Sequence, residues 1–160
     1  NADYNEQITT CKPFKNSLIE LHAYGWCGID DNGLSECYKL QILNACDNNK
    51  ITTCKPFKNS LIKLHAGGIC GIDDNGLSEC NKIQILNADY NEKITTCKPF
   101  KNSLIELSAD YSCGINDNGL LECNKLQKIE AYWNSKITIK QRRSKLDILS
   151  GYPFKKIVIK

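Results

Sequence analysis

The stretch LIELHAYGWCGI, Leu18–Ile29, sets out a spacing that recurs along the whole chain. The apolar positions that recur are Leu18, Leu21, Ala23 and Ile29. The same spacing starts again at six later positions, 20 to 22 residues apart: Leu40, Leu61, Ile83, Leu104, Leu126 and Leu146. Ala2 and Ile8 occupy the last two positions of an earlier, partial unit. Self-similarity at such a period is typical of a repeat array.

Within each unit, L-x-x-L-x-A places alternate residues on one side of a short strand. A unit of about 21 residues cannot bury that side alone, whereas parallel stacking of units builds a continuous core and pairs the strand backbones. The sequence therefore predicts an α/β-type solenoid. We expect a curved parallel β-sheet on its concave face, with loops, turns and short helical or 3-10 segments on its convex face.

Pairs of units form a longer repeat, because residues 1–43, 44–86 and 87–129 align without a gap. We assign residues 1–145 to the array, with about seven turns and a partial first one. Residues 146–160 are predicted to form a C-terminal capping turn and strand, since KKIVIK alternates charged and apolar residues. The N-terminus has no comparable cap, so we expect a longer parent chain or a partner at that end.

The pattern L-x-x-L-x-A-x-x-N-x-x-I resembles the leucine-rich repeat over essentially the whole chain. Units such as Leu18–Leu40 are similar to the cysteine-containing subtype. The matching positions are Ile29, Asp30, Gly33, Leu34, Cys37 and Leu40. Cys27 lies one position later than in that subtype, and the unit is shorter. The CGIDDNG wording and the alternating units also resemble repeat arrays encoded by large DNA viruses of amoebae.

The resemblance implies a protein-binding array with a substrate-receptor or adaptor role, although no F-box-like helical segment accompanies it. It also implies a structural role for one asparagine in each double repeat, which hydrogen-bonds loop backbone along the stack. These asparagines are Asn5, Asn48, Asn91 and Asn134.

The motif CGIDDNGL, at Cys27–Leu34 and Cys70–Leu77 and nearly again at Cys113–Leu120, admits a metal, redox or turn interpretation. Asn-Gly favours a turn, because both residues tolerate positive φ. The EF-hand spacing of a calcium loop is not met. In register with the repeat, Cys27 and Ile29 are predicted core positions, residues 30–33 a turn, and Leu34 a core position again.

Nine of the ten cysteines fall into three ladders, 11/54/97, 27/70/113 and 37/80/123, and Cys46 stands alone. Members of one ladder lie two turns apart, roughly 10 Å at the strand spacing, which exceeds the Cα separation of a disulfide. Pairing between ladders stays open. We predict no metal site, because C-x-x-C is absent and His22 and His65 are two turns apart. Buried reduced thiols favour a reducing compartment, the cytoplasm, with a virion or infected host cell as the alternative.

The side chains between the buried strand positions are predicted to form the concave face, where tyrosine and tryptophan accumulate. These residue types anchor protein interfaces. We predict that a partner protein binds there. The predicted binding residues are Tyr24, Tyr90, Tyr111, Tyr132, Trp133, His22, His65, Asp89 and Asp110. The alternative is that the rings only pack against one another along the sheet.

Catalytic signatures are missing from the sequence, so we predict a non-enzyme without catalytic residues or cofactor. The net charge is +3, and residues 130–160 hold eight Lys and Arg against Glu130 and Asp147. A mildly acidic body with a basic end does not favour nucleic acid as a partner, and no apolar run is long enough for a membrane span. The leading hypothesis is a non-catalytic protein–protein interaction module. The alternative is a structural or assembly component, for example of a virion, that self-associates through its N-terminal edge.

Overall fold

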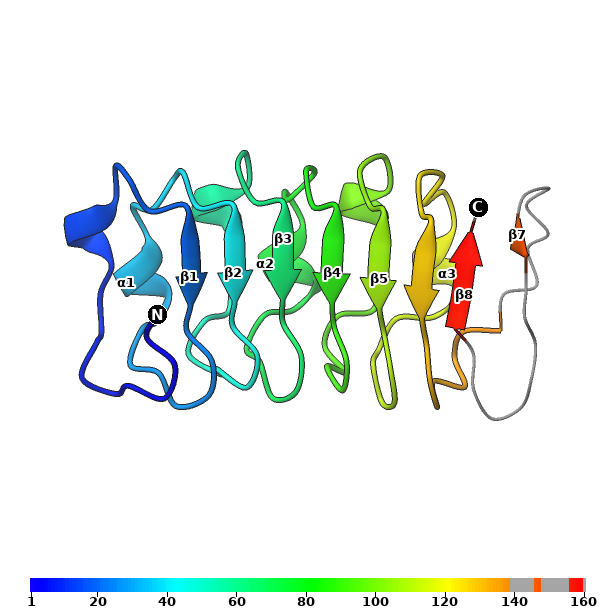
Figure 1. The fold of residues 1–160 in the computed structure, drawn as a ribbon, viewed down its shortest axis with the longest axis horizontal. Coiled ribbons are helices and arrows are strands. Elements are labelled where there is room, and N and C mark those ends of the chain that lie inside the picture. The colour runs from blue at the N-terminus through cyan, green and yellow to red at the C-terminus, as the bar shows by residue number, and fades with distance from the viewer. Residues whose placement is uncertain (139–145, 148–155, 160) are drawn as a thin grey trace.

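The computed structural model describes residues 1–138, 146–147 and 156–159. Six short strands lie side by side in chain order and pair in parallel (Figure 1). They are β1 (Glu20–His22), β2 (Ile42–Asn44), β3 (Lys63–His65), β4 (Ile85–Asn87), β5 (Glu106–Ser108) and β6 (Lys128–Glu130). The predicted parallel sheet of repeating units is confirmed.

The core runs behind this sheet because the central residue of each strand points inward. In the register, Leu21 pairs with Leu43 and Leu43 with Leu64, so the same position recurs in every strand. The alanine two residues after each central residue, such as Ala45, is also buried. Period-2 alternation leaves the residues on either side of the central one on the opposite face.

Short helical segments return the chain between strands. Three 3-10 turns share the sequence KPF: η1 (Lys12–Phe14), η2 (Lys55–Phe57) and η3 (Lys98–Phe100). Three one-turn helices share DNGL: α1 (Asp31–Leu34), α2 (Asp74–Leu77) and α3 (Asp117–Leu120). The 3-10 turns precede the odd-numbered strands, and the helices precede the even-numbered ones. The regular alternation of helical segments agrees with an α/β repeat fold.

The CGIDDNGL motif therefore contains the one-turn helix α1 where a turn at residues 30–33 was predicted, and neither Asn32 nor Gly33 has positive φ. The Asp30 carboxylate accepts a hydrogen bond from the Gly33 N–H at 2.8 Å and caps α1. Gly33 is required for contact rather than for backbone freedom, because a Cβ there would lie 2.3 Å from the Thr9 carbonyl oxygen. The predicted burial of Cys27, Ile29 and Leu34 is confirmed.

The chain after β6 departs from the parallel pattern. Strand β8 (Lys156–Ile159) pairs antiparallel with β6, and β7 (Leu146–Asp147) pairs antiparallel with β8. The sequence after residue 138 contains neither the KPF nor the DNGL segment that returns the chain earlier. Strand β8 lies within residues 146–160, the predicted capping turn and strand. Leu149 and Gly151 lie outside the described residues, and the division at residue 145 stays a prediction.

The thiols belong to the core. All ten cysteines are free, and all but the half-buried Cys46 are buried. Burial raises the pKa of the Cys70 thiol from 9.0 to about 12.

Within the described ranges, no group of three or more His, Cys, Asp and Glu side chains could hold a metal ion. The same residues include no helix of the length and apolarity needed to cross a membrane.

The open face of the sheet as a candidate binding site

The strand residues that flank the buried central position form what we call the open face. Their side chains are half-buried or exposed, in contrast to the buried central residues between them, which are leucines in β1 to β5 and Ile129 in β6. The open face consists of Glu20, His22, Ile42, Asn44, Lys63, His65, Ile85, Asn87, Glu106, Ser108, Lys128 and Glu130.

After each strand, the chain passes the buried alanine and reaches two positions at the edge of the open face. We call the first the inner row and the second the border row. The inner row comprises Asp3, Tyr24, Cys46, Gly67, Asp89, Asp110 and Tyr132. The border row comprises Tyr4, Gly25, Asp47, Gly68, Tyr90, Tyr111 and Trp133, all with φ between 57° and 66°.

The border row combines left-handed backbone with exposed aromatic rings. This conformation disfavours a Cβ by about 1–2 kcal/mol, which explains the glycines in the row. Four positions nevertheless carry aromatic rings, with exposed fractions of 63% for Tyr4, 50% for Tyr90, 42% for Tyr111 and 59% for Trp133. The rings of Tyr90 and Tyr111 stack at 4.3 Å between centroids with an interplanar angle of 12°.

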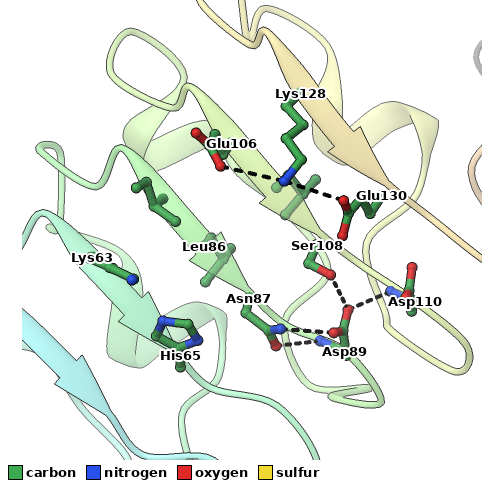
Figure 2. A pocket seen from close by; sticks show the side chains of 12 residues that line it. Lys63, His65, Leu86, Asn87, Asp89, Glu106, Ser108, Asp110, Lys128 and Glu130 are labelled. Atoms are coloured by element: carbon green, nitrogen blue, oxygen red, sulfur yellow. Dashed lines mark hydrogen bonds and ion pairs between the residues drawn. The ribbon is translucent and has the colours of Figure 1, made fainter. Parts of the chain in front are cut away.

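A hollow of about 350 Å³ lies on the open face across β3 to β6 (Figure 2). Inner-row aspartates border it. Asp89 accepts hydrogen bonds from the Ser108 hydroxyl at 2.7 Å, the Asp110 backbone N–H at 2.8 Å and the Asn87 amide at 2.8 Å. Its carboxylate thus joins two consecutive units by hydrogen bonds, since Asn87 belongs to its own unit and Ser108 and Asp110 to the next.

Asp110 repeats this arrangement one unit later, because its carboxylate accepts the Tyr132 N–H at 2.6 Å. Burial raises the pKa of the Asp110 carboxyl, and the nearby charges of Asp89 and Glu130 act in the same direction. The hollow therefore concentrates negative charge at the end lined by Asp89, Asp110 and Glu130.

Basic side chains of the hollow are distributed unevenly. Lys128 lies between two carboxylates, 3.3 Å from Glu130 and 3.8 Å from Glu106 (Figure 2). His65 and Lys63 lie at the other end, on β3. Burial lowers the pKa of the His65 imidazole, and the positive charges of Lys63 and His22 lower it further.

The structure divides the predicted binding residues into three groups. Asp89, Asp110 and His65 meet at the hollow, and Tyr90, Tyr111 and Trp133 lie along the border row. The remaining three lie elsewhere: Tyr132 on the inner row, half-buried, and His22 and Tyr24 at the β1 end, where His22 Nε2 is 2.9 Å from Glu20 Oε1. The rings of Tyr24 and Tyr4 meet edge to face at 5.0 Å.

Several residues of the hollow were missing from the predicted set: Asn87, Glu106, Ser108, Lys128 and Glu130. The alternation around the central strand residue places these side chains on the predicted concave face, but it does not distinguish the ones that line the hollow from the others.

Comparison with models of known protein families finds no match to this chain, and comparison with curated proteins finds none either. The chemistry of the open face is therefore the basis for assigning a function.

Proposed function

We propose that this chain is a leucine-rich repeat solenoid, related to the cysteine-containing subtype, that acts as a non-catalytic protein–protein interaction module. Its partner binds the open face, which is the concave face of the proposed solenoid. The observation that carries the proposal is the border row, where four exposed aromatic rings occupy positions whose backbone favours glycine.

The repeat assignment is supported by hydrogen bonds that recur from unit to unit. Asn48 and Asn91 are buried, and each amide donates to two carbonyl oxygens of the preceding units, such as Ala66 and Ile72 for Asn91. This is the structural role that the resemblance implies for these asparagines.

The binding role is supported by the cost of the border-row rings. A Tyr or Trp held at left-handed φ is strained relative to Gly, and such strain concentrates at functional positions. Gly25 and Gly68 occupy the same row, so the backbone itself accepts glycine there. Tyrosine and tryptophan contribute a large contact area at a partner surface.

Panning a library of displayed random peptides against the immobilised chain tests this function. We expect binders whose affinity falls at least tenfold with Tyr111→Ala and with Trp133→Ala. Tyr38→Ala is the matched control, since Tyr38 is 62% exposed but lies in the loop before β2. Peptides that bind all three variants equally would overturn the proposal.

A second candidate, an assembly component, is favoured by the apolar surface of the first unit. Ile8 and Phe14 are 37% and 59% exposed, whereas their equivalents in later units are buried: Ile51, Ile94, Phe57 and Phe100. An added unit or a second molecule would cover them. Light scattering should then show association that grows with concentration and is abolished by Phe14→Glu. A wild-type chain that stays monomeric throughout would exclude this candidate.

A further inference from the structure

The open face and its two rows carry a charge opposite to that of the chain as a whole. The chain has a formal net charge of +3. This surface holds two lysines, Lys63 and Lys128, against seven carboxylates: Asp3, Glu20, Asp47, Asp89, Glu106, Asp110 and Glu130. Charge complementarity at a binding surface guides partner choice and association rate. A cationic partner is therefore favoured over an anionic one such as nucleic acid.

The carboxylates and the exposed rings run along the same edge. Inner-row and border-row residues are neighbours in sequence, so that Asp89 precedes Tyr90 and Asp110 precedes Tyr111. Tyr90, Tyr111 and Trp133 belong to three consecutive units, and the first two rings are already stacked. Aromatic faces attract guanidinium and ammonium groups by about 0.5–2 kcal/mol.

At the end of the hollow lined by Asp89, Asp110 and Glu130, the carboxylates outnumber the one lysine, Lys128. Lys128 contacts both Glu106 and Glu130. Among the described residues, the hydrogen-bond donors to Asp89 are neutral: Asn87, Ser108 and the backbone. Asp110 receives a backbone N–H at one oxygen. Hydrogen bonds from neutral donors hold these carboxylates in place and leave their charge uncompensated, so an added cation is stabilised there.

We propose that the partner segment bound by the open face is a basic peptide. One of its arginine or lysine side chains lies in the hollow beside Asp110 and Glu130, and its neighbours lie against the rings of Tyr90, Tyr111 and Trp133. Arginine fits best, because its planar guanidinium both pairs with carboxylates and stacks on rings. This inference rests on the proposed function and names the chemistry of the partner.

Tryptophan fluorescence provides a local test. The chain has two tryptophans, so Trp26→Phe leaves Trp133 as the sole reporter, on the border row. The probe is an Arg-Gly repeat peptide, and the control is the same peptide with citrulline in place of arginine, which keeps the shape and removes the charge. We expect the arginine peptide to change the Trp133 emission in a saturable way, with an affinity at least tenfold higher than that of the citrulline peptide. This affinity should fall as the salt concentration is raised.

Variants that each remove one carboxylate show whether the peptide binds at the hollow or responds only to the overall acidity of the surface. Asp110→Asn keeps an oxygen acceptor for the Tyr132 N–H, and Glu130→Gln keeps the shape of its side chain. Each should weaken binding of the arginine peptide about fivefold or more. Glu79→Gln is the matched control, because Glu79 pairs with Lys58 outside the open face. Equal weakening by Glu79→Gln and Glu130→Gln, or equal affinity for the citrulline peptide, would overturn the inference.

The library experiment distinguishes failure of this inference from failure of the proposed function. Selected peptides that depend on Tyr111 and Trp133 and are enriched in arginine or lysine support both. Peptides that depend on these rings but are neutral or acidic preserve the proposed function and refute the basic partner. An open face that selects no peptide refutes the proposed function as well.

Discussion

At the scale of single residues, the invariant positions of the repeat make contacts between consecutive units. Asn91 donates its amide to Ala66 O at 2.8 Å and to Ile72 O at 3.2 Å, and its Oδ1 accepts the Lys93 N–H at 2.9 Å. The residue is 1% exposed. One side chain thus satisfies two buried carbonyl oxygens and the N–H of Lys93, from three stretches of chain, and no apolar residue can replace it.

Asn91→Ala should lower the free energy of unfolding by at least about 2 kcal/mol, because buried backbone groups lose their partners. Asn5→Ala is the matched control at the equivalent position of the first unit. Asn5 is exposed and accepts one hydrogen bond, from the Gln7 N–H at 3.0 Å. Its replacement should cost less than about 1 kcal/mol in urea denaturation. Similar losses for the two variants would contradict the structural role of the ladder.

Gly76 contributes to the contact between units because it has no side chain. A Cβ at Gly76 would lie 2.1 Å from the carbonyl oxygen of Thr52. Helix propensity alone predicts that Gly76→Ala stabilises α2 by up to about 1 kcal/mol. The contact predicts destabilisation of about 1–3 kcal/mol, the usual cost of overpacking. Thermal unfolding decides the sign, with the exposed Asn81→Ala as control; a raised Tm for Gly76→Ala would disprove the contact.

At the scale of elements, the one-turn helices depend on their caps and on the following unit. Asp73 caps α2 by accepting the Gly76 N–H at 2.8 Å. Asp74, the next residue, accepts the Thr95 N–H at 2.8 Å and the Thr95 hydroxyl at 2.6 Å. The two adjacent carboxylates therefore have different roles: Asp73 caps the N-terminus of α2, and Asp74 binds the loop of the next unit. A helix this short is stable only through such contacts.

Asp73→Ala should cost about 1 kcal/mol, the usual value of an N-cap. Asp73→Asn should be nearly neutral, because the chain itself uses this replacement: Asn116 caps α3 by accepting the Gly119 N–H at 3.0 Å. Chemical denaturation of both variants at pH 7 measures the difference. If Asn proved as damaging as Ala, the charge of Asp73 rather than its oxygen acceptor would be the stabilising feature.

At the scale of the whole molecule, the core contains thiols whose protonated form is preferred in the folded state. Burial raises the pKa of Cys70 to about 12 and the pKa of Cys11 and of Cys113 to about 11, from 9.0. Above pH 9 the unfolded chain therefore loses protons that the folded chain retains, and stability falls as pH rises. The full contribution of these thiols is present below pH 9.

We expect the free energy of unfolding to decrease between pH 9 and pH 12 for this reason. Cys70→Ala removes one of the buried thiols, so its stability curve should be shallower by up to about 1.4 kcal/mol per pH unit in that range. The variant is less stable overall at pH 7 because of the cavity, but the slope is independent of that offset. Parallel curves for variant and wild type would refute the preference for the protonated thiol.

The repeating order of the chain was predictable from sequence because it depends on local periodicity. The spacing of Leu18, Leu21 and Ala23 determines which strand residues are inward, and its recurrence determines the parallel pairing. The burial of nine cysteines followed from the same register. The aromatic and acidic character of the edge was also visible in the sequence, since tyrosine, tryptophan or aspartate follows every strand from β1 to β6 except β3, where Gly67 and Gly68 stand.

Contacts between units were decided only by the tertiary structure. Asn-Gly in the CGIDDNGL motif permits both a turn and a helix, and the structure has a helix whose Gly33 lies so close to Thr9 that a Cβ there would be 2.3 Å from the Thr9 carbonyl oxygen. The sequence does not reveal that Asp89 is occupied by Ser108 and the Asp110 N–H, or that Lys128 lies between Glu106 and Glu130. Periodicity determines the direction in which a side chain points. In contacts such as those of Asp89 with Ser108 and of Lys128 with Glu106, the partner of a side chain is about one unit away in sequence. Only stacking of the units brings the two residues together.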